Sequence, residues 1–129
     1  MKYLINKAKI ALKNAYAPYS KFYVGCSLEM KDGTIFLGSN VENISYGGTI
    51  CAERSAIVAA ISNGYKKKDF KAIAIVANTN KYIRPCFICR QTFVEFFDKD
   101  MKIVLGKIDD DFEILRIGDL IPYPFENFQ

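Results

Sequence analysis

Three of the four cysteines in the sequence have the spacing of metal ligands. Cys86 and Cys89 form a Cys-x-x-Cys pair, whose thiolates point to one side on the first turn of a helix and can chelate one ion. Such a pair can also be a redox dithiol, and a third ligand favours the metal site: Cys51 stands at the start of another expected helix. We therefore predict one zinc ion, bound by Cys51, Cys86 and Cys89.

Charged residues next to Cys51 indicate that this zinc is catalytic. Three thiolates on Zn²⁺ leave a net charge of about minus one, which two helix N-termini would offset with about half a positive charge each. Arg54, three positions after Cys51, is placed to hydrogen-bond the ligand sulfurs. Three protein ligands leave the fourth position to water, and Glu53 is suited to act as a base beside it. The sequence has no histidine, so a histidine base is excluded.

The elements that must position these residues follow from hydrophobic patterning. Helices are expected over 2–16, 51–63 and 86–97. Strands are expected over 21–30, 34–41, 72–77, 102–105 and 112–115, the first two joined by a hairpin at Asp32-Gly33. In the tail over 118–129, Pro122 and Pro124 argue against regular structure. A hairpin followed by alternating helices and strands predicts a three-layer α/β/α domain with a mixed five-stranded sheet.

Composition narrows the class of protein. A chain of 129 residues, half apolar and a quarter charged, predicts a single domain over residues 1–129. No apolar run is long enough to cross a bilayer, and lysines interrupt residues 1–16 where a signal peptide is apolar, so we expect a cytoplasmic protein without a membrane partner. The net charge is +4 and its one dense basic run, Lys66–Lys68, is typical of a solvated tip, which gives no support for a nucleic-acid partner.

Two motifs together resemble a known family. The segment T-I-C-A-E-R at 49–54, with P-C-F-I-C-R-Q at 85–91, is similar to the cytidine deaminase family, in which a His or Cys ligand precedes a proton-shuttling Glu by two residues. The likeness is to the short homotetrameric type with a three-cysteine zinc site, and it covers essentially the whole chain. It implies a cytidine deaminase-like fold and hydrolytic deamination of cytidine and 2′-deoxycytidine to uridine and 2′-deoxyuridine in pyrimidine salvage, with Glu53 as the catalytic residue.

The resemblance also implies the residues of a nucleoside site. Phe22 would pack against the pyrimidine ring, Asn40 and Glu42 would bind the ribose hydroxyls, and Ala52 would contact the substrate. Ordinary structural roles compete with these assignments: a core position for Phe22 and loop capping for Asn40 and Glu42.

Two further aromatic residues are expected to act between subunits. Tyr46 and Phe125 resemble residues that related tetramers send into a neighbouring subunit's pocket. If they do so here, the site is complete only in a homotetramer.

The chain departs from the family pattern at three positions. Phe87 and Arg84 stand where smaller residues are commoner, and Tyr23 replaces a frequent proline, so these positions bear on substrate preference. The first alternative function is a deaminase of the same fold that acts on another aminopyrimidine or on a polynucleotide. The second is a non-catalytic zinc module in which Cys26, otherwise expected in the core, supplies a fourth thiolate. The zinc content of a Cys26→Ser variant separates that module from the enzyme.

Overall fold

The computed structural model describes residues 1–126, and within them it contains one five-stranded sheet with the strand order β2-β1-β3-β4-β5. The strands are β1 (Val24–Met30), β2 (Ile35–Ser39), β3 (Phe70–Ala77), β4 (Lys102–Gly106) and β5 (Phe112–Arg116). The helices are α1 (Lys2–Leu12), α2 (Ala52–Ser62) and α3 (Phe87–Phe96). Strands β3 and β4 are parallel and the other neighbouring pairs are antiparallel, which confirms the expected mixed sheet.

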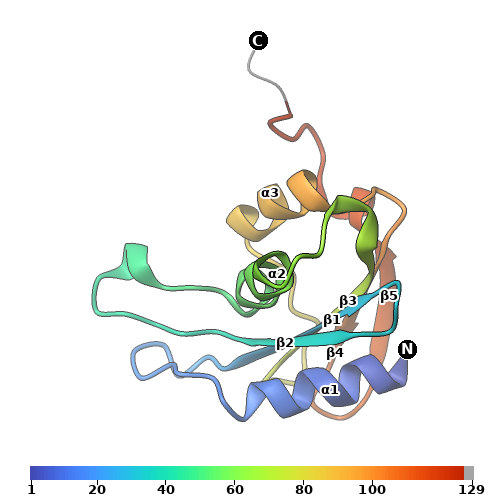
Figure 1. Cartoon of the computed structure of the whole chain (residues 1–129). Coiled ribbons are helices and arrows are strands. Elements are labelled where there is room, and N and C mark those ends of the chain that lie inside the picture. Colours follow the sequence, from blue (N-terminus) through green and yellow to red (C-terminus); the bar gives the residue numbers. More distant parts are fainter. Residues whose placement is uncertain (127–129) are drawn as a thin grey trace.

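Helices cover both faces of the sheet. Helix α1 lies on one face, and α2 and α3 lie on the other (Figure 1). Alternate residues of β3 enter the two cores: Ala72, Ala74 and Val76 on the side of α1, and Ile73, Ile75 and Ala77 on the other. This double burial explains the nearly continuous apolar run that predicted the strand. The three-layer α/β/α architecture is therefore confirmed.

The boundaries of the first elements differ from those expected. Helix α1 ends at Leu12 rather than residue 16, and the chain then turns so that Tyr16 forms an isolated bridge with Val41. Strand β1 begins at Val24 rather than residue 21, because the backbone of residues 19–23 is hydrogen-bonded by side chains instead of by a neighbouring strand. The hairpin is confirmed, with Gly33 at a φ of 92° in its turn.

The tail is more regular than its prolines indicated. Residues 117–120 form a short 3₁₀ helix, so regular structure extends past the expected end at residue 118, and Pro122 follows where it ends. Among the described residues, no helix has both the length and the apolar character needed to span a bilayer.

Gly38 fixes the approach of α2 to the sheet. A Cβ atom at this position would lie 2.2 Å from the carbonyl oxygen of Ala52 and 2.7 Å from the backbone nitrogen of Ala56. The first turn of α2 therefore packs directly against the backbone of β2. Because the residues at the start of α2 carry the chemistry, this contact also sets the position of the candidate site.

Replacing Gly38 by alanine is expected to lower the free energy of unfolding by about 3 kcal/mol, because the added methyl group forces α2 away from β2. Chemical denaturation of the zinc-loaded protein measures the change. Gly47→Ala is the matched control, since nothing lies within 4 Å of a Cβ at Gly47. Equal stability of the two variants would contradict the proposed contact.

Candidate active site

The structure brings Cys51, Cys86 and Cys89 together. Their sulfur atoms all lie within 4.8 Å of one another, and those of Cys51 and Cys86 are 3.6 Å apart. Tetrahedral Zn–S bonds of about 2.3 Å separate two sulfurs by about 3.8 Å, so the cluster has the dimensions of a zinc site. Among the described residues the cluster consists of these three cysteines, and Cys26, fully buried in β1, is not part of it.

Two helix N-termini meet at the cluster. Cys51 is the N-cap of α2 and Cys86 the N-cap of α3, so each helix begins one residue later than expected. The two sulfurs of the Cys-x-x-Cys pair therefore do not both lie on a helical turn as predicted: the Cys86 sulfur caps α3 by accepting a hydrogen bond from the Cys89 backbone N–H at 3.4 Å. The exposed N–H groups and dipoles of both helices favour negative charge at this point.

Arg54 provides a full positive charge beside the sulfurs. Its Nη2 atom donates to the Cys51 sulfur and to the Thr49 carbonyl oxygen, both at 3.5 Å. Its Nε atom is buried without a hydrogen-bond partner in the protein. A guanidinium with one buried and unpaired N–H fits a cluster of thiolates, because the sulfurs supply the negative charge that balances it.

The pKa values of the Cys51 and Cys89 thiols are shifted in opposite directions. A hydrogen bond from Cys89 and the adjacent Arg54 lower the pKa of Cys51 to about 5. The same hydrogen bond, together with burial, raises the pKa of Cys89. The Cys51 thiolate therefore forms readily, which is the state that binds a metal ion.

A pocket of about 270 Å³ opens above the cluster. It is lined by Cys51, Cys86, Glu53 and several of the residues expected to bind substrate: Phe22, Asn40, Glu42 and Ala52. Glu53 is only 4% exposed, and burial raises the pKa of its carboxyl to about 7. Ala52 lines the same pocket and is itself fully buried. One pocket therefore contains a metal-ligating surface, a buried carboxyl group and an aromatic wall.

Asn40 and Glu42 also hold the loop that precedes β1. The Asn40 side chain accepts from the Val24 N–H at 2.9 Å and donates to the Phe22 carbonyl oxygen at 2.8 Å. Glu42 accepts from the Tyr19 and Ser20 N–H groups, both at 3.0 Å. The capping alternative considered for these two residues is thus realised, and it is compatible with substrate binding because both still line the pocket.

Tyr46 and Phe125 do not reach this pocket within the same chain. Tyr46 is 80% exposed and lies in an arm closed at its base by the Val41–Ile50 bridge, and Phe125 is 62% exposed in the tail. Both segments project from the body of the protein (Figure 1).

Two polar residues that the sequence did not single out contact expected site residues. Ser20 lines the pocket and donates a hydrogen bond to Glu42, and the Gln91 side chain pairs with both the N–H and the carbonyl oxygen of Phe125. No sequence signal distinguishes Ser20 from an ordinary loop residue, and Gln91 ends the motif at 85–91 without a role assigned to it there, because each role arises from a contact between distant segments.

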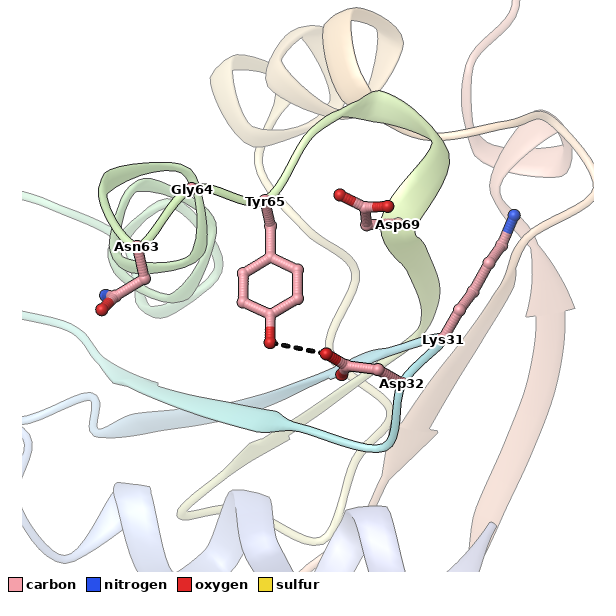
Figure 2. Close-up of a pocket in the computed structure, with 6 residues that line it drawn as sticks. All are labelled: Lys31, Asp32, Asn63, Gly64, Tyr65 and Asp69. Carbon is pink, nitrogen blue, oxygen red and sulfur yellow. Dashed lines mark hydrogen bonds between the residues drawn. The ribbon is translucent and has the colours of Figure 1, made fainter.

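A larger depression, of about 580 Å³, lies elsewhere (Figure 2). It is formed by the β1–β2 turn and the segment after α2, about 16 Å along that helix from Cys51. The Tyr65 hydroxyl donates to Asp32 at 2.8 Å across it (Figure 2). The depression contains no cysteine or histidine, so the chemistry is assigned to the pocket above the cluster.

Comparisons with known proteins agree with the geometry. The family model for the cytidine and deoxycytidylate deaminase zinc-binding region matches residues 1–106. The cytidine deaminase of Halalkalibacterium halodurans is 44% identical over 122 residues, covering 95% of this chain and 91% of that protein. The crystal structure of cytidine deaminase from Burkholderia pseudomallei has a TM-score of 0.91 and 45% identity, covering 95% of this chain and 97% of that one. The corresponding structure from Mycobacterium tuberculosis has a TM-score of 0.80 and 35% identity, covering 95% and 94%.

The mixed sheet and the cysteine cluster define a zinc-dependent hydrolase with an α/β fold. One zinc ion per chain is its cofactor, and the cluster of Cys51, Cys86 and Cys89 fits that ion. The chain belongs to the cytidine and deoxycytidylate deaminase family.

Proposed function

We propose that this enzyme hydrolyses cytidine and 2′-deoxycytidine to uridine and 2′-deoxyuridine with release of ammonia, a reaction of pyrimidine salvage. The observation that carries the proposal is that the buried Glu53 carboxyl and the three-cysteine cluster share one pocket. A metal-ligating surface beside a carboxyl group is the arrangement that hydrolysis of an aromatic amine requires.

Glu53 is the proton carrier of the proposed mechanism. A zinc ion held by the three cysteines would make a bound water more acidic. Glu53 accepts one proton from the water that adds to C4 of the ring and passes it to N3. It then accepts the second proton, from the hydroxyl group now on C4, and passes it to the departing amine, so that water and cytidine are converted to uridine and ammonia. Arg54 keeps the cluster in place through its hydrogen bond to Cys51.

Phe22, Asn40, Glu42 and Ala52 hold the nucleoside in register in this proposal. All four residues line the pocket, which supports this assignment. Phe22 offers an aromatic face to the pyrimidine, and a carboxylate beside an amide matches adjacent sugar hydroxyls.

The charge of the pocket favours free nucleosides over nucleotides. Its lining includes two carboxyl groups, Glu42 and Glu53, and one cationic side chain, Arg84. Arg84 is already paired with Glu113, with 2.7 Å between Nη1 and Oε1. A 5′-phosphate would therefore meet little unpaired positive charge.

An absorbance assay tests the proposed function. The zinc-loaded protein is mixed with cytidine, 2′-deoxycytidine, cytosine base or CMP, and the fall in ultraviolet absorbance that accompanies deamination is followed. Turnover of the two nucleosides alone is the expected result. No turnover of either, with one zinc per chain confirmed, would contradict the proposal and favour another aminopyrimidine. Competition by oligonucleotides would favour a polynucleotide substrate.

A homotetramer in which neighbouring chains complete each pocket forms part of this proposal. It is supported by exposed apolar side chains that follow Cys86, lie on α2 or belong to the projecting segments: Tyr46, Val58, Phe87, Ile88 and Phe125. Large exposed apolar side chains of this kind favour packing against another chain. Gln91 fixes the backbone of Phe125 through hydrogen bonds of 2.7 and 3.3 Å, so this aromatic ring is presented from a defined position.

Replacing Phe125 by alanine is expected to lower kcat/KM for cytidine about tenfold, the effect of about 1.4 kcal/mol of lost aromatic contact. Steady-state kinetics measure the effect, and light scattering reports the assembly. Ile10→Ala is the control, since Ile10 is an exposed apolar residue of α1 on the opposite face of the sheet. A monomer in light scattering that retains full activity would contradict completion of the site by a neighbour.

A further inference from the structure

Residues 19–23 form a loop that carries two pocket residues, Ser20 and Phe22, between α1 and β1. Lys21, between them, has a φ of 59°, a left-handed conformation that costs energy in a residue with a side chain. Such a conformation persists where surrounding contacts determine it. The contacts of this loop therefore show what holds the pocket wall in place.

The Glu42 carboxylate is the anchor of this loop, and its two oxygens have different surroundings. Oε1 accepts hydrogen bonds from the backbone N–H groups of Tyr19 and Ser20, both at 3.0 Å. Oε2 accepts from the Ser20 hydroxyl group. These hydrogen bonds, the one from the Ser20 hydroxyl above all, lower the pKa of Glu42, so the group is a carboxylate at neutral pH. Oε2 retains the acceptor capacity that a ligand hydroxyl group can use.

The Ser20 hydroxyl also reaches the second pocket residue of the loop. Its oxygen accepts a hydrogen bond from the Phe22 backbone N–H at 3.0 Å. One hydroxyl group therefore joins the carboxylate proposed to bind the sugar to the backbone of the residue proposed to pack on the ring. Ser20 itself lines the pocket with both of them.

We propose that Ser20 is a positioning residue for the sugar of the substrate: its hydroxyl orients Oε2 of Glu42 toward a ribose or deoxyribose hydroxyl group. This inference rests on the proposed function and deepens it. Ser20 acts through Glu42, so its contribution is to the binding of nucleosides that carry a sugar hydroxyl. The hydrogen bond from Ser20 to Oε2 lies within the protein itself, so it can fix the orientation of this oxygen without help from the substrate.

The test compares Ser20→Ala and Ser20→Thr with the wild-type enzyme on two substrates, cytidine and 2′,3′-dideoxycytidine, which lacks the 2′ and 3′ hydroxyl groups of the sugar. For Ser20→Ala, kcat/KM of cytidine is expected to fall about tenfold, mainly through KM, as for the loss of one hydrogen bond to a charged group. For dideoxycytidine, kcat/KM is expected to fall about twofold or less, because this substrate has no 2′ or 3′ hydroxyl group for Glu42 to bind. Ser20→Thr keeps the hydroxyl group, so its kcat/KM is expected to be within about threefold of the wild-type value on both substrates.

The controls separate positioning from folding. Ser62→Ala removes an exposed hydroxyl group at the far end of α2 and is expected to leave kcat/KM unchanged for both substrates. Zinc content and the unfolding midpoint are measured for every variant. If Ser20→Ala does not fold, Ser20→Cys, which is similar in size and a weak donor, takes its place with the same expected pattern.

The results are decisive in either direction. Equal losses on both substrates, no loss on cytidine, or failure of Ser20→Thr to restore activity would each overturn the role of Ser20. Each of these leaves the proposed function intact, because the wild-type enzyme still deaminates cytidine. A wild-type protein that binds zinc yet turns over neither nucleoside would overturn the proposed function and the role of Ser20 together.

Discussion

Replacing Glu53 by glutamine is expected to lower kcat for cytidine by at least about 10³-fold while one zinc ion stays bound. The amide has nearly the shape of the carboxyl group, so the pocket around this side chain, which is only 4% exposed, keeps its packing. Glutamine has no carboxylate to accept a proton, so the transfer of protons from water to the ring and to the leaving amine is lost. The measurements are the single-turnover rate and the zinc content of the purified variant.

Glu95→Gln is the matched control for this substitution. Glu95 lies on α3, and its exposed side chain makes an ion pair with Lys67 at 3.9 Å, a contact worth little in water. The Glu95→Gln variant is expected to deaminate cytidine at the wild-type rate. A Glu53→Gln enzyme with more than about a tenth of the wild-type rate would contradict the role of Glu53, whereas loss of zinc would show that the substitution disturbed the cluster instead.

The sequence predicted the fold well where local pattern and tertiary packing require the same structure. The apolar run of β3 is continuous because both faces are covered, and the Asp32-Gly33 hairpin needs a positive φ that Gly33 adopts. The prediction failed at residues 13–16 and 21–23. Their periodicity continues the adjacent helix or strand, but hydrogen bonds to distant segments occur there: the Tyr16 N–H donates to the Asn40 carbonyl oxygen and the Tyr23 N–H to the Asn78 side chain, both at 2.9 Å.

The site shows the same difference between features that follow from residue type and spacing and features that depend on long-range contacts. The cysteine cluster was predictable because a metal requires particular ligand types, and the spacing of Cys86 and Cys89 restricts where they can lie. The role of Ser20 was not predictable, because serine is common in loops and its partner Glu42 is 22 residues away. Gln91 is a second example: it ends the motif at 85–91, but that motif does not indicate its contact with Phe125, 34 residues away. A hydrogen bond between two distant segments has no signature in a single sequence.

Replacing Cys89 by serine is expected to abolish retention of zinc, and with it activity. The three sulfurs lie within 4.8 Å of one another, Cys89 is the fully buried member, and the metal-ligating group among the described residues has no fourth member. A serine hydroxyl stays protonated and is a poor zinc ligand, so the variant offers two thiolates. Zinc per chain after desalting is the direct measurement. Thermal unfolding with and without added zinc is the second, since binding to the folded state raises the midpoint.

Cys26→Ser tests the opposite possibility. Cys26 is buried in the core of β1 and lies outside the cluster, so its variant is expected to retain one zinc ion per chain and its activity, with some loss of stability from a buried hydroxyl. If Cys26→Ser lost zinc as Cys89→Ser does, Cys26 would be a fourth thiolate ligand. A site closed by four thiolates has no coordination position for water, so that result would contradict the catalytic interpretation of the whole pocket.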